Sequence, residues 1–238
     1  ESLLIPQQLL NNLNWGWTLL LLSTRFTGMM LALPGIGEGI RGLMVRGPAI
    51  MVLSFACVGS GALADIPENS IELVFQAASE FTFGFCIGMI PQLVLAGVKL
   101  AGHLSGTTMG LGAAQLMDPN LGISVSDLSR IFGDLCTVLF LMLGGHHAVI
   151  YAVSGMEGHI VPGSFVPGEI SLELLIQATG DIFRLGVLVS APVVVALLLT
   201  QFVMGLLTKA VPQVNIFIIS FPLTIGIGLI LSFLSLPE

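Results

Sequence analysis

Charged residues are scarce in this sequence. They make up 9% of the 238 residues, and Lys and Arg together number only 7. A soluble domain carries about 25% charged residues, so this chain has too little charge to cover a surface that faces water. Nucleic-acid binding is excluded as well, because the cations are spread singly and form no basic patch.

Cysteine is scarce, and the usual catalytic signatures are missing. Cys57, Cys86 and Cys136 lie far apart within apolar runs, as is typical of small buried side chains. His146 and His147 are adjacent, so on a helix we expect them to point to different faces and to make a poor chelate. HExxH, GxSxG, P-loop and dinucleotide motifs are absent. We therefore expect no metal, no cofactor and no enzymatic activity.

Apolar residues are abundant, at 55% of the chain with a mean hydropathy of +1.00. No basic region precedes the first apolar run, so we expect no cleavable signal peptide. A spanning helix needs about 20 apolar residues. The sequence therefore predicts an all-α, polytopic membrane protein with about six apolar helical segments. These are residues 15–33, 47–64, 71–101, 125–153, 171–209 and 214–236.

The third and fifth segments are longer than a perpendicular crossing requires, and they contain Pro91 and Pro192. We expect them to be kinked and either strongly tilted or extended into a protein assembly. Lys and Arg fall on alternate connections between the segments. The positive-inside rule then places both termini outside and the connection between segments three and four on the cytoplasmic side.

A glycine-rich stretch, residues 102–122, interrupts the chain near its middle and ends in Asp118-Pro119-Asn120. It is too rich in glycine for an ordinary spanning helix and too poor in charge for a loop in water. This composition predicts irregular backbone at membrane depth that protein shields or that faces a water-filled cavity. The same composition also fits a re-entrant or surface loop that only connects two helices.

Ionisable residues within apolar segments are candidates for function. Arg25 and Glu80 either pair across helices or contact a partner subunit. Asp181 and Arg184 are spaced to pair on one helix face, and such a pair also fits a purely structural polar interface. Asp134 is the other carboxylate of this kind, and these few carboxylates are too scattered for a proton relay.

The C-terminal region carries the most specific pattern in the chain. Residues 207–224 read LTKAVPQVNIFIISFPLT, in which a basic residue precedes V-P-Q-x-N-x-F and a later F-P-L. This run resembles the FliR family of flagellar export proteins. The Met117-Asp118-Pro119 turn, the run Gly144-Gly145-His146-His147 and the opening from Arg25 to Pro34 also resemble that family, so the resemblance spans most of the chain.

The resemblance implies a subunit that assembles with FliP and FliQ into the gate of the flagellar type III secretion system. The gate lies in the bacterial inner membrane at the flagellar basal body, with FlhB and FlhA nearby, and passes unfolded export substrates. Residues 1–170 would then be a FliP-like helical part, and residues 171–238 a FliQ-like helical hairpin. The long, kinked segments would belong to a helical hetero-oligomer that rises partly out of the membrane plane.

The resemblance also implies that residues 106–122 are a plug in the central channel. A glycine-rich loop packs closely and moves without breaking a regular helix. The expected plug residues are Gly106, Met109, Gly110, Gly112, Gln115, Met117, Asp118 and Pro119, with Met109 and Met117 contributing to the seal. The expected residues of the hairpin turn are Lys209, which ends a helix, Pro212, which breaks it, and Gln213 and Asn215, which bond exposed backbone groups.

Other functions fit parts of the same sequence. The homologous subunit of virulence injectisomes, the SctT family, resembles this chain in the same organisation of segments. The V-P-Q-x-N-x-F motif is closer to the flagellar branch. A free-standing secondary transporter would also use interrupted helices around a polar break. An intramembrane enzyme is disfavoured, because no catalytic constellation is present.

Overall fold

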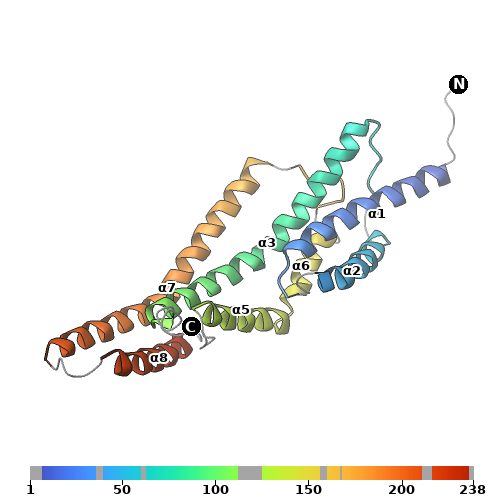
Figure 1. Ribbon diagram of the computed structural model, residues 1–238. Helices are drawn as coiled ribbons and strands as arrows, with labels where there is room; N and C mark the ends of the chain where they lie inside the picture. Colours follow the sequence, from blue (N-terminus) through green and yellow to red (C-terminus); the bar gives the residue numbers. More distant parts are fainter. Residues whose placement is uncertain are drawn as a thin grey trace. The chain divides into compact units, whose positions relative to one another are not determined.

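The computed structural model describes residues 7–35, 40–59, 63–111, 125–155, 160–166, 168–210 and 216–235, and these ranges contain helices and no strand (Figure 1). This architecture confirms the predicted all-α class. The helices are α1 (Gln7–Ala32), α2 (Ile40–Val58), α3 (Ser70–Thr108), α5 (Val125–Met142), α6 (Gly145–Ser154), α7 (Glu169–Ala210) and α8 (Ile216–Ser235).

Two helical stretches in the described part of the chain are long and apolar enough to cross a membrane, Ser70–Thr108 and Ile176–Ala210. The bent pair α5–α6 makes a third if it counts as one span, and shorter apolar stretches cover Met44–Val58 and Ile219–Leu234. Helix α7 has 42 residues, which at 1.5 Å per residue is about 63 Å. The predicted over-long third and fifth segments are therefore present as single long helices.

The predicted fourth segment, residues 125–153, is not one continuous helix. It is divided into α5 and α6, which meet at a bend of 64°. Gly144 lies at the bend with φ of 73°, in the left-handed region, and its N–H donates to the carbonyl of Leu141 at 3.1 Å. A glycine adopts this conformation without steric cost, so the pattern of apolar residues alone does not reveal the break.

The chain forms two compact units, each built from two separate stretches of sequence. The first contains residues 1–92 and 137–176, and the second contains residues 93–136 and 177–238. The expected division at residue 170 concerns likeness to FliP and FliQ, and it stays a prediction.

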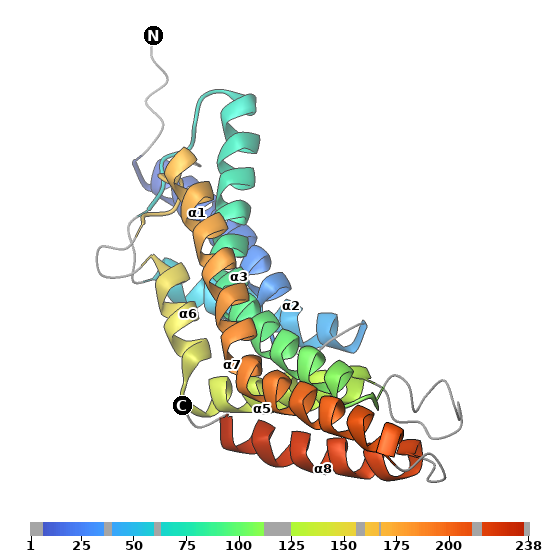
Figure 2. The same ribbon diagram turned by 90° about the vertical axis from the view of Figure 1, so that its left-hand side faces the viewer.

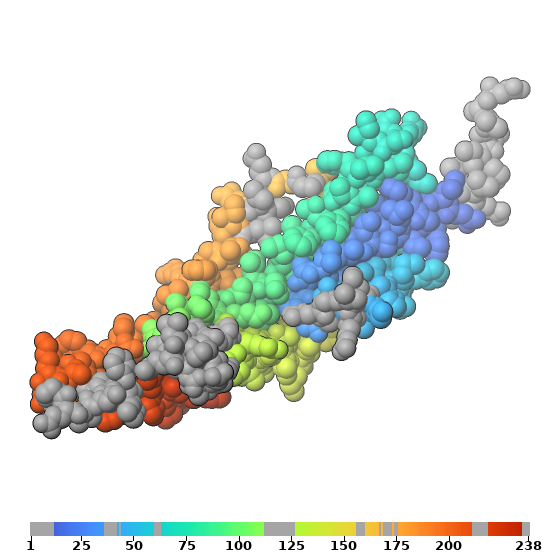
Figure 3. All heavy atoms as spheres, viewed as in Figure 1, coloured from blue at the N-terminus to red at the C-terminus, as the bar shows by residue number. Residues whose placement is uncertain are grey.

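In the first unit, α1 lies against α2 and against the first half of α3 (Figures 1 and 3). The buried core there consists of Leu22, Phe26, Met29, Met30, Cys57, Val58 and Val153. Glycines let α1 and α3 approach backbone to backbone, since a Cβ on Gly84 would lie 1.9 Å from the carbonyl oxygen of Arg25. Gly88, four residues further along α3, makes a similar contact, because a Cβ there would lie 2.6 Å from the carbonyl oxygen of Met29.

In the second unit, α7 and α8 run side by side as a helical hairpin (Figure 2). They share a core with the end of α3 and the start of α5, formed by Met109, Leu111, Leu128, Phe132, Val193 and Leu197. Helices α3 and α7 meet at two glycines, because a Cβ on Gly186 would lie 2.6 Å from the carbonyl oxygen of Gly97.

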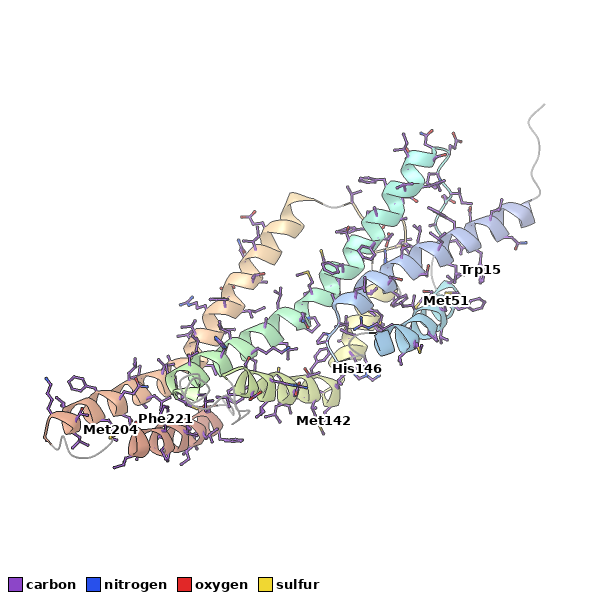
Figure 4. The ribbon with its side chains drawn as sticks, viewed as in Figure 1. Trp15, Met51, Met142, His146, Met204 and Phe221 are labelled. Carbon is purple, nitrogen blue, oxygen red and sulfur yellow. The ribbon has the colours of Figure 1, made fainter. Side chains whose placement is uncertain are left out.

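Much of the remaining helix surface is apolar and exposed. Figure 4 shows Met51 and Met142 pointing away from the helices that carry them, and these side chains are 57% and 79% exposed. On α7 the exposed apolar side chains include Phe202 and Leu199. Apolar surface of this extent requires lipid or partner proteins as its surroundings, which agrees with the apolar helices of a membrane protein.

Candidate functional site

The start of the glycine-rich stretch is helical. Helix α3 continues through Gly102 and Gly106 to Thr108, so the prediction of irregular backbone from residue 102 is wrong for these residues. Both glycines are buried, and a Cβ on Gly102 would come within 2.9 Å of the Cα of Ser129. Gly102 thus provides close packing of α3 on α5, which a composition count does not distinguish from a turn.

The chain leaves α3 in a turn at Met109 and Gly110. The N–H of Met109 donates to the carbonyl of Ser105 at 2.9 Å, and that of Gly110 to the carbonyl of Thr107 at 3.1 Å. Gly110 has φ of 84°, a left-handed conformation that favours glycine. We call residues 105–111 the loop root, because the rest of the expected plug follows from it.

Two side chains from the α7–α8 hairpin bind the carbonyls of the loop root. Gln201 Nε2 donates to the carbonyl of Thr108 at 2.6 Å. The single proton of Thr224 Oγ1 is shared between the carbonyl of Met109 at 3.1 Å and the carbonyls of Ser220 and Phe221 in its own helix at 2.9 and 3.2 Å. Carbonyls at the end of a helix lack partners within the helix. These two bonds therefore satisfy the end of α3 and fix it to both helices of the hairpin.

The side chain of Met109 faces the interior of its own chain. It is 1% exposed and occupies the space above Gly228 on α8, where a Cβ would lie 2.5 Å from Met109 Cε. A Cβ on Gly110 would lie 3.1 Å from the ring of Phe221, a residue of α8 labelled in Figure 4. In this arrangement Met109 anchors the loop root, and its expected contribution to a channel seal stays a prediction.

The other end of the loop is fixed to the same core. Leu128 and Phe132 of α5 pack in one cluster with Met109 and Leu111. Ser129 Oγ donates to the carbonyl of Lys99 at 2.7 Å. Both helices that flank the loop are thus held together within the second unit.

Several predicted site residues lie outside the described residues. For the plug these are Gly112, Gln115, Met117, Asp118 and Pro119, and for the hairpin turn they are Pro212, Gln213 and Asn215. Lys209 is described, and it lies exposed in the last turn of α7, where a cation interacts favourably with the helix dipole.

A buried ion pair joins Arg25 of α1 to Glu80 of α3 in the first unit. Both side chains have 0% exposure, and Arg25 Nε pairs with Glu80 Oε2. The sequence left open whether Arg25 and Glu80 pair with each other or contact a partner subunit. In the structure they pair with each other. The ring of Phe83 lies 4.7 Å from the guanidinium carbon, close enough for a cation–π interaction.

The ion pair also holds the segment that follows α6. Arg25 Nη1 donates to the carbonyls of Val153 at 3.2 Å and Ile160 at 2.9 Å. Glu80 Oε1 accepts from the N–H of Gly163 at 2.7 Å. These bonds satisfy part of the pair and fasten residues 160–163 to α1 and α3, while the buried Arg25 Nη2 has no hydrogen-bond partner among the described residues.

Asp181 and Arg184 are not brought together in an ion pair. Both are exposed on α7, and the second ion pair in the described part of the chain is instead the exposed Arg130–Asp134 at 3.8 Å.

His146 and His147 do not point to different faces as expected. Their ring centroids are 4.0 Å apart in the first turn of α6, where the adjacent Gly144 and Gly145 carry no side chains. Figure 4 labels His146 at this bend. Among the described residues, no group of three or more His, Cys, Asp or Glu side chains is placed to hold a metal ion.

Sequence reasoning missed Gln201, Thr224 and Gly228, which hold the loop root. The available signal was a polar residue within an apolar helix, because such a residue must find a hydrogen-bond partner inside the membrane. Thr224 even lies within the C-terminal motif, directly after Phe221-Pro222-Leu223.

Comparison with known proteins gives consistent matches over most of the chain. A sequence model of the family described as "Bacterial export proteins, family 1" matches residues 17–238. "Flagellar biosynthetic protein FliR" of Aquifex aeolicus is 30% identical over 221 residues, which are 92% of this chain and 85% of that protein. The protein of the same name from Escherichia coli is 31% identical over 75% of this chain and 69% of its own length.

An injectisome-type relative is also similar. "Surface presentation of antigens protein SpaR" of Shigella flexneri is 24% identical over 82% of this chain and 76% of its own length. The family match covers nearly the whole sequence, and the Aquifex aeolicus and Escherichia coli proteins share higher identity with this chain than this relative does. This chain belongs to bacterial export protein family 1, the family of the FliR flagellar biosynthetic proteins.

Proposed function

We propose that this chain is the FliR-type subunit of a flagellar protein export gate in the bacterial inner membrane. In this proposal it assembles with FliP and FliQ into the channel that passes unfolded export substrates, with FlhA and FlhB nearby. It acts as part of a conduit and catalyses no reaction. The relatives named for flagellar biosynthesis support the flagellar setting.

The observation that carries the proposal is the loop root. Bonds from Gln201 and Thr224 to the end of α3, and the core shared with α5, give the glycine-rich loop two fixed ends. A gate must stop ions at rest and admit a polypeptide on demand. A glycine-rich loop on a rigid base suits both tasks, since the base sets its position while the loop itself rearranges.

The exposed apolar helix surface supports assembly with other membrane subunits. On α7 alone, Phe183, Leu199 and Phe202 are each more than 60% exposed. Asp181 and Arg184 lie exposed on the same helix, and charged side chains within an apolar helix require polar partners. We propose that neighbouring subunits provide these partners.

The first test is the native mass of the complex purified through a tag on this chain, after co-expression with the neighbouring membrane genes. A defined hetero-oligomer that contains FliP and FliQ is the expected result. A monomer or homo-oligomer that forms regardless of those genes would contradict the proposal and favour a secondary transporter. Copurification with injectisome subunits instead would place the chain in the branch of SpaR.

The second test addresses the plug. Removing residues 112–118 leaves the described loop root intact, so the complex should assemble with unchanged native mass. We expect ion leakage through reconstituted complexes to rise, because the deleted residues no longer fill the channel. Unchanged leakage in a fully assembled complex would show that the loop only connects α3 to α5.

A further inference from the structure

A pocket of about 300 Å³ opens on one face of the second unit. Its floor is a stripe of α3 that contains Leu93, Ala96, Gly97 and Leu100, and α5 and α7 form its walls. The pocket begins beside the contact of Gly97 with Gly186, where the backbones of α3 and α7 meet. Thr179, Ile182 and Phe183 line the α7 side.

Two nitrogen-bearing side chains stand in the mostly apolar lining of this pocket. Lys99 and His103 are one helical turn apart on α3 and both line the pocket, as expected for an i, i+4 pair. Lys99 is half-buried and His103 is exposed. Lys99 is one of only 7 Lys and Arg residues in the chain, so a cationic side chain at this position is unusual for this protein.

The stem of Lys99 is packed against α5. The stem lies over Gly133 of α5, where a Cβ would come within 2.5 Å of Lys99 Cε. Within the described residues Lys99 takes part in no ion pair, whereas Arg130 and Asp134 of α5 pair with each other. A half-buried ammonium without a counter-charge is costly, and an anionic ligand removes that cost.

We propose that this pocket binds an anionic phospholipid, with the phosphate on Lys99 and His103 and an acyl chain along the apolar floor. One molecule that is anionic at one end and a hydrocarbon at the other matches this lining. The lining is apolar and open to the surroundings on the α7 side, where Phe183 is 61% exposed. Basic pockets between helices of a membrane protein recognise lipid headgroups in this way.

The test uses the complex purified through this chain and measures bound lipid by native mass during titration with phosphatidylglycerol or phosphatidylcholine. Phosphatidylglycerol is expected to bind more tightly. Lys99→Gln should weaken its binding about fivefold, as expected for one cation near a headgroup, while Lys99→Arg retains it. The matched control is Arg130→Gln, because Arg130 is 82% exposed and lies outside the pocket lining.

A second variant tests the acyl-chain part of the pocket without changing charge. Ala96→Phe places a ring on the floor, so it should reduce binding of phosphatidylglycerol with long acyl chains and leave binding of inorganic phosphate unchanged. This variant also keeps the proposal testable if Lys99→Gln prevents assembly.

Three results would overturn the proposal. Equal binding of the two lipids, or equal effects of Lys99→Gln and Arg130→Gln, would show that no headgroup is recognised. Inorganic phosphate that binds as tightly as phosphatidylglycerol would make the site one for free anions. A zero-length cross-link from Lys99 to a carboxylate of a partner subunit would assign the pocket to a protein contact. These lipid measurements can also be made on a chain that purifies without partners. Failure of the lipid proposal is therefore distinguishable from failure of the proposed role in an export gate.

Discussion

Arg25 and Glu80 form an ion pair that is completely excluded from solvent, although 55 positions separate them in the sequence. Each residue binds a second element of the chain, Arg25 through the carbonyls of Val153 and Ile160 and Glu80 through the N–H of Gly163. The pair therefore joins α1, α3 and the segment after α6.

Removal of one partner of this pair should be strongly destabilising. Glu80→Gln retains an acceptor for Gly163 but leaves the Arg25 charge buried without compensation, at a cost of about 3–5 kcal/mol. We expect a large loss of folded chain, measured by thermal aggregation of the detergent-solubilised complex. The double variant Arg25→Met with Glu80→Leu removes both charges and should be milder than Glu80→Gln alone. A Glu80→Gln protein as stable as the parent would show that the pair contributes little.

The crossing of α1 and α3 should tolerate no side chain at position 84. A Cβ there would lie 1.9 Å from the carbonyl oxygen of Arg25, and a backbone atom cannot move aside as a flexible side chain does. Gly84→Ala should therefore lower stability enough to reduce the amount of assembled complex severely. Gly16→Ala on α1 is the matched control, because nothing lies within 4 Å of its Cβ position. That change should stabilise the helix by up to about 1 kcal/mol, and similar losses from both variants would refute the proposed clash.

The loop root should respond to a single methyl group on α8. Gly228→Ala places a Cβ 2.5 Å from Met109 Cε and 2.6 Å from Met109 Cγ, so the methionine must leave its position. We expect increased ion leakage through the assembled complex. Met109→Ala in the same chain makes room for the new methyl group and should reduce the ion leakage again in part. A double-mutant cycle on the free energy of unfolding should then give a coupling of about 0.5–3 kcal/mol between the two positions. Gly226→Ala, with open space at its Cβ position, should have no effect; additive effects at positions 228 and 109 would contradict the contact.

The hydroxyl of Thr224 should contribute to the same anchoring. Thr224→Val retains the shape but leaves the buried carbonyl of Met109 without this donor, at a cost of about 1–3 kcal/mol. Thr224→Ser keeps the donor and should behave much more like the parent. The measurement is hydrogen exchange at the amides of residues 105–111, which should quicken in Thr224→Val only. Equal exchange in both variants would mean that packing alone holds the root.

Local sequence patterns predicted the helical elements well, because long apolar runs bounded by Pro, Gly and charged residues need little else to define them. The C-terminal motif identified the family because its residues are contiguous in the sequence. The bend at Gly144 was not predictable in this way, since it depends on one backbone conformation within an apolar run. The role of Gly102 was also ambiguous, because glycine serves equally in turns and in close helix contacts.

Contacts between distant residues account for most of what the sequence did not reveal. Thr224 and Met109 are 115 positions apart, and Gln201 and Thr108 are 93 apart. No periodicity connects such positions, so the loop root had to be seen in three dimensions. Arg25 and Glu80 were recognised as candidates because charge is rare in apolar segments. Their hydrogen bonds to residues 160–163 were not predictable from spacing.

The glycines of α3 also bear on how far this sequence can diverge. Gly84 meets a backbone carbonyl of α1, and Gly97 and Gly186 bring α3 against α7. Relatives that share 30% identity have exchanged most of their residues, and apolar core positions tolerate exchange when volume is kept. A backbone-to-backbone contact offers no comparable substitute, because every other residue adds an atom where none fits. Positions 84, 97 and 186 are therefore among those at which exchange should be slowest, and they are suitable anchors for aligning remote homologues.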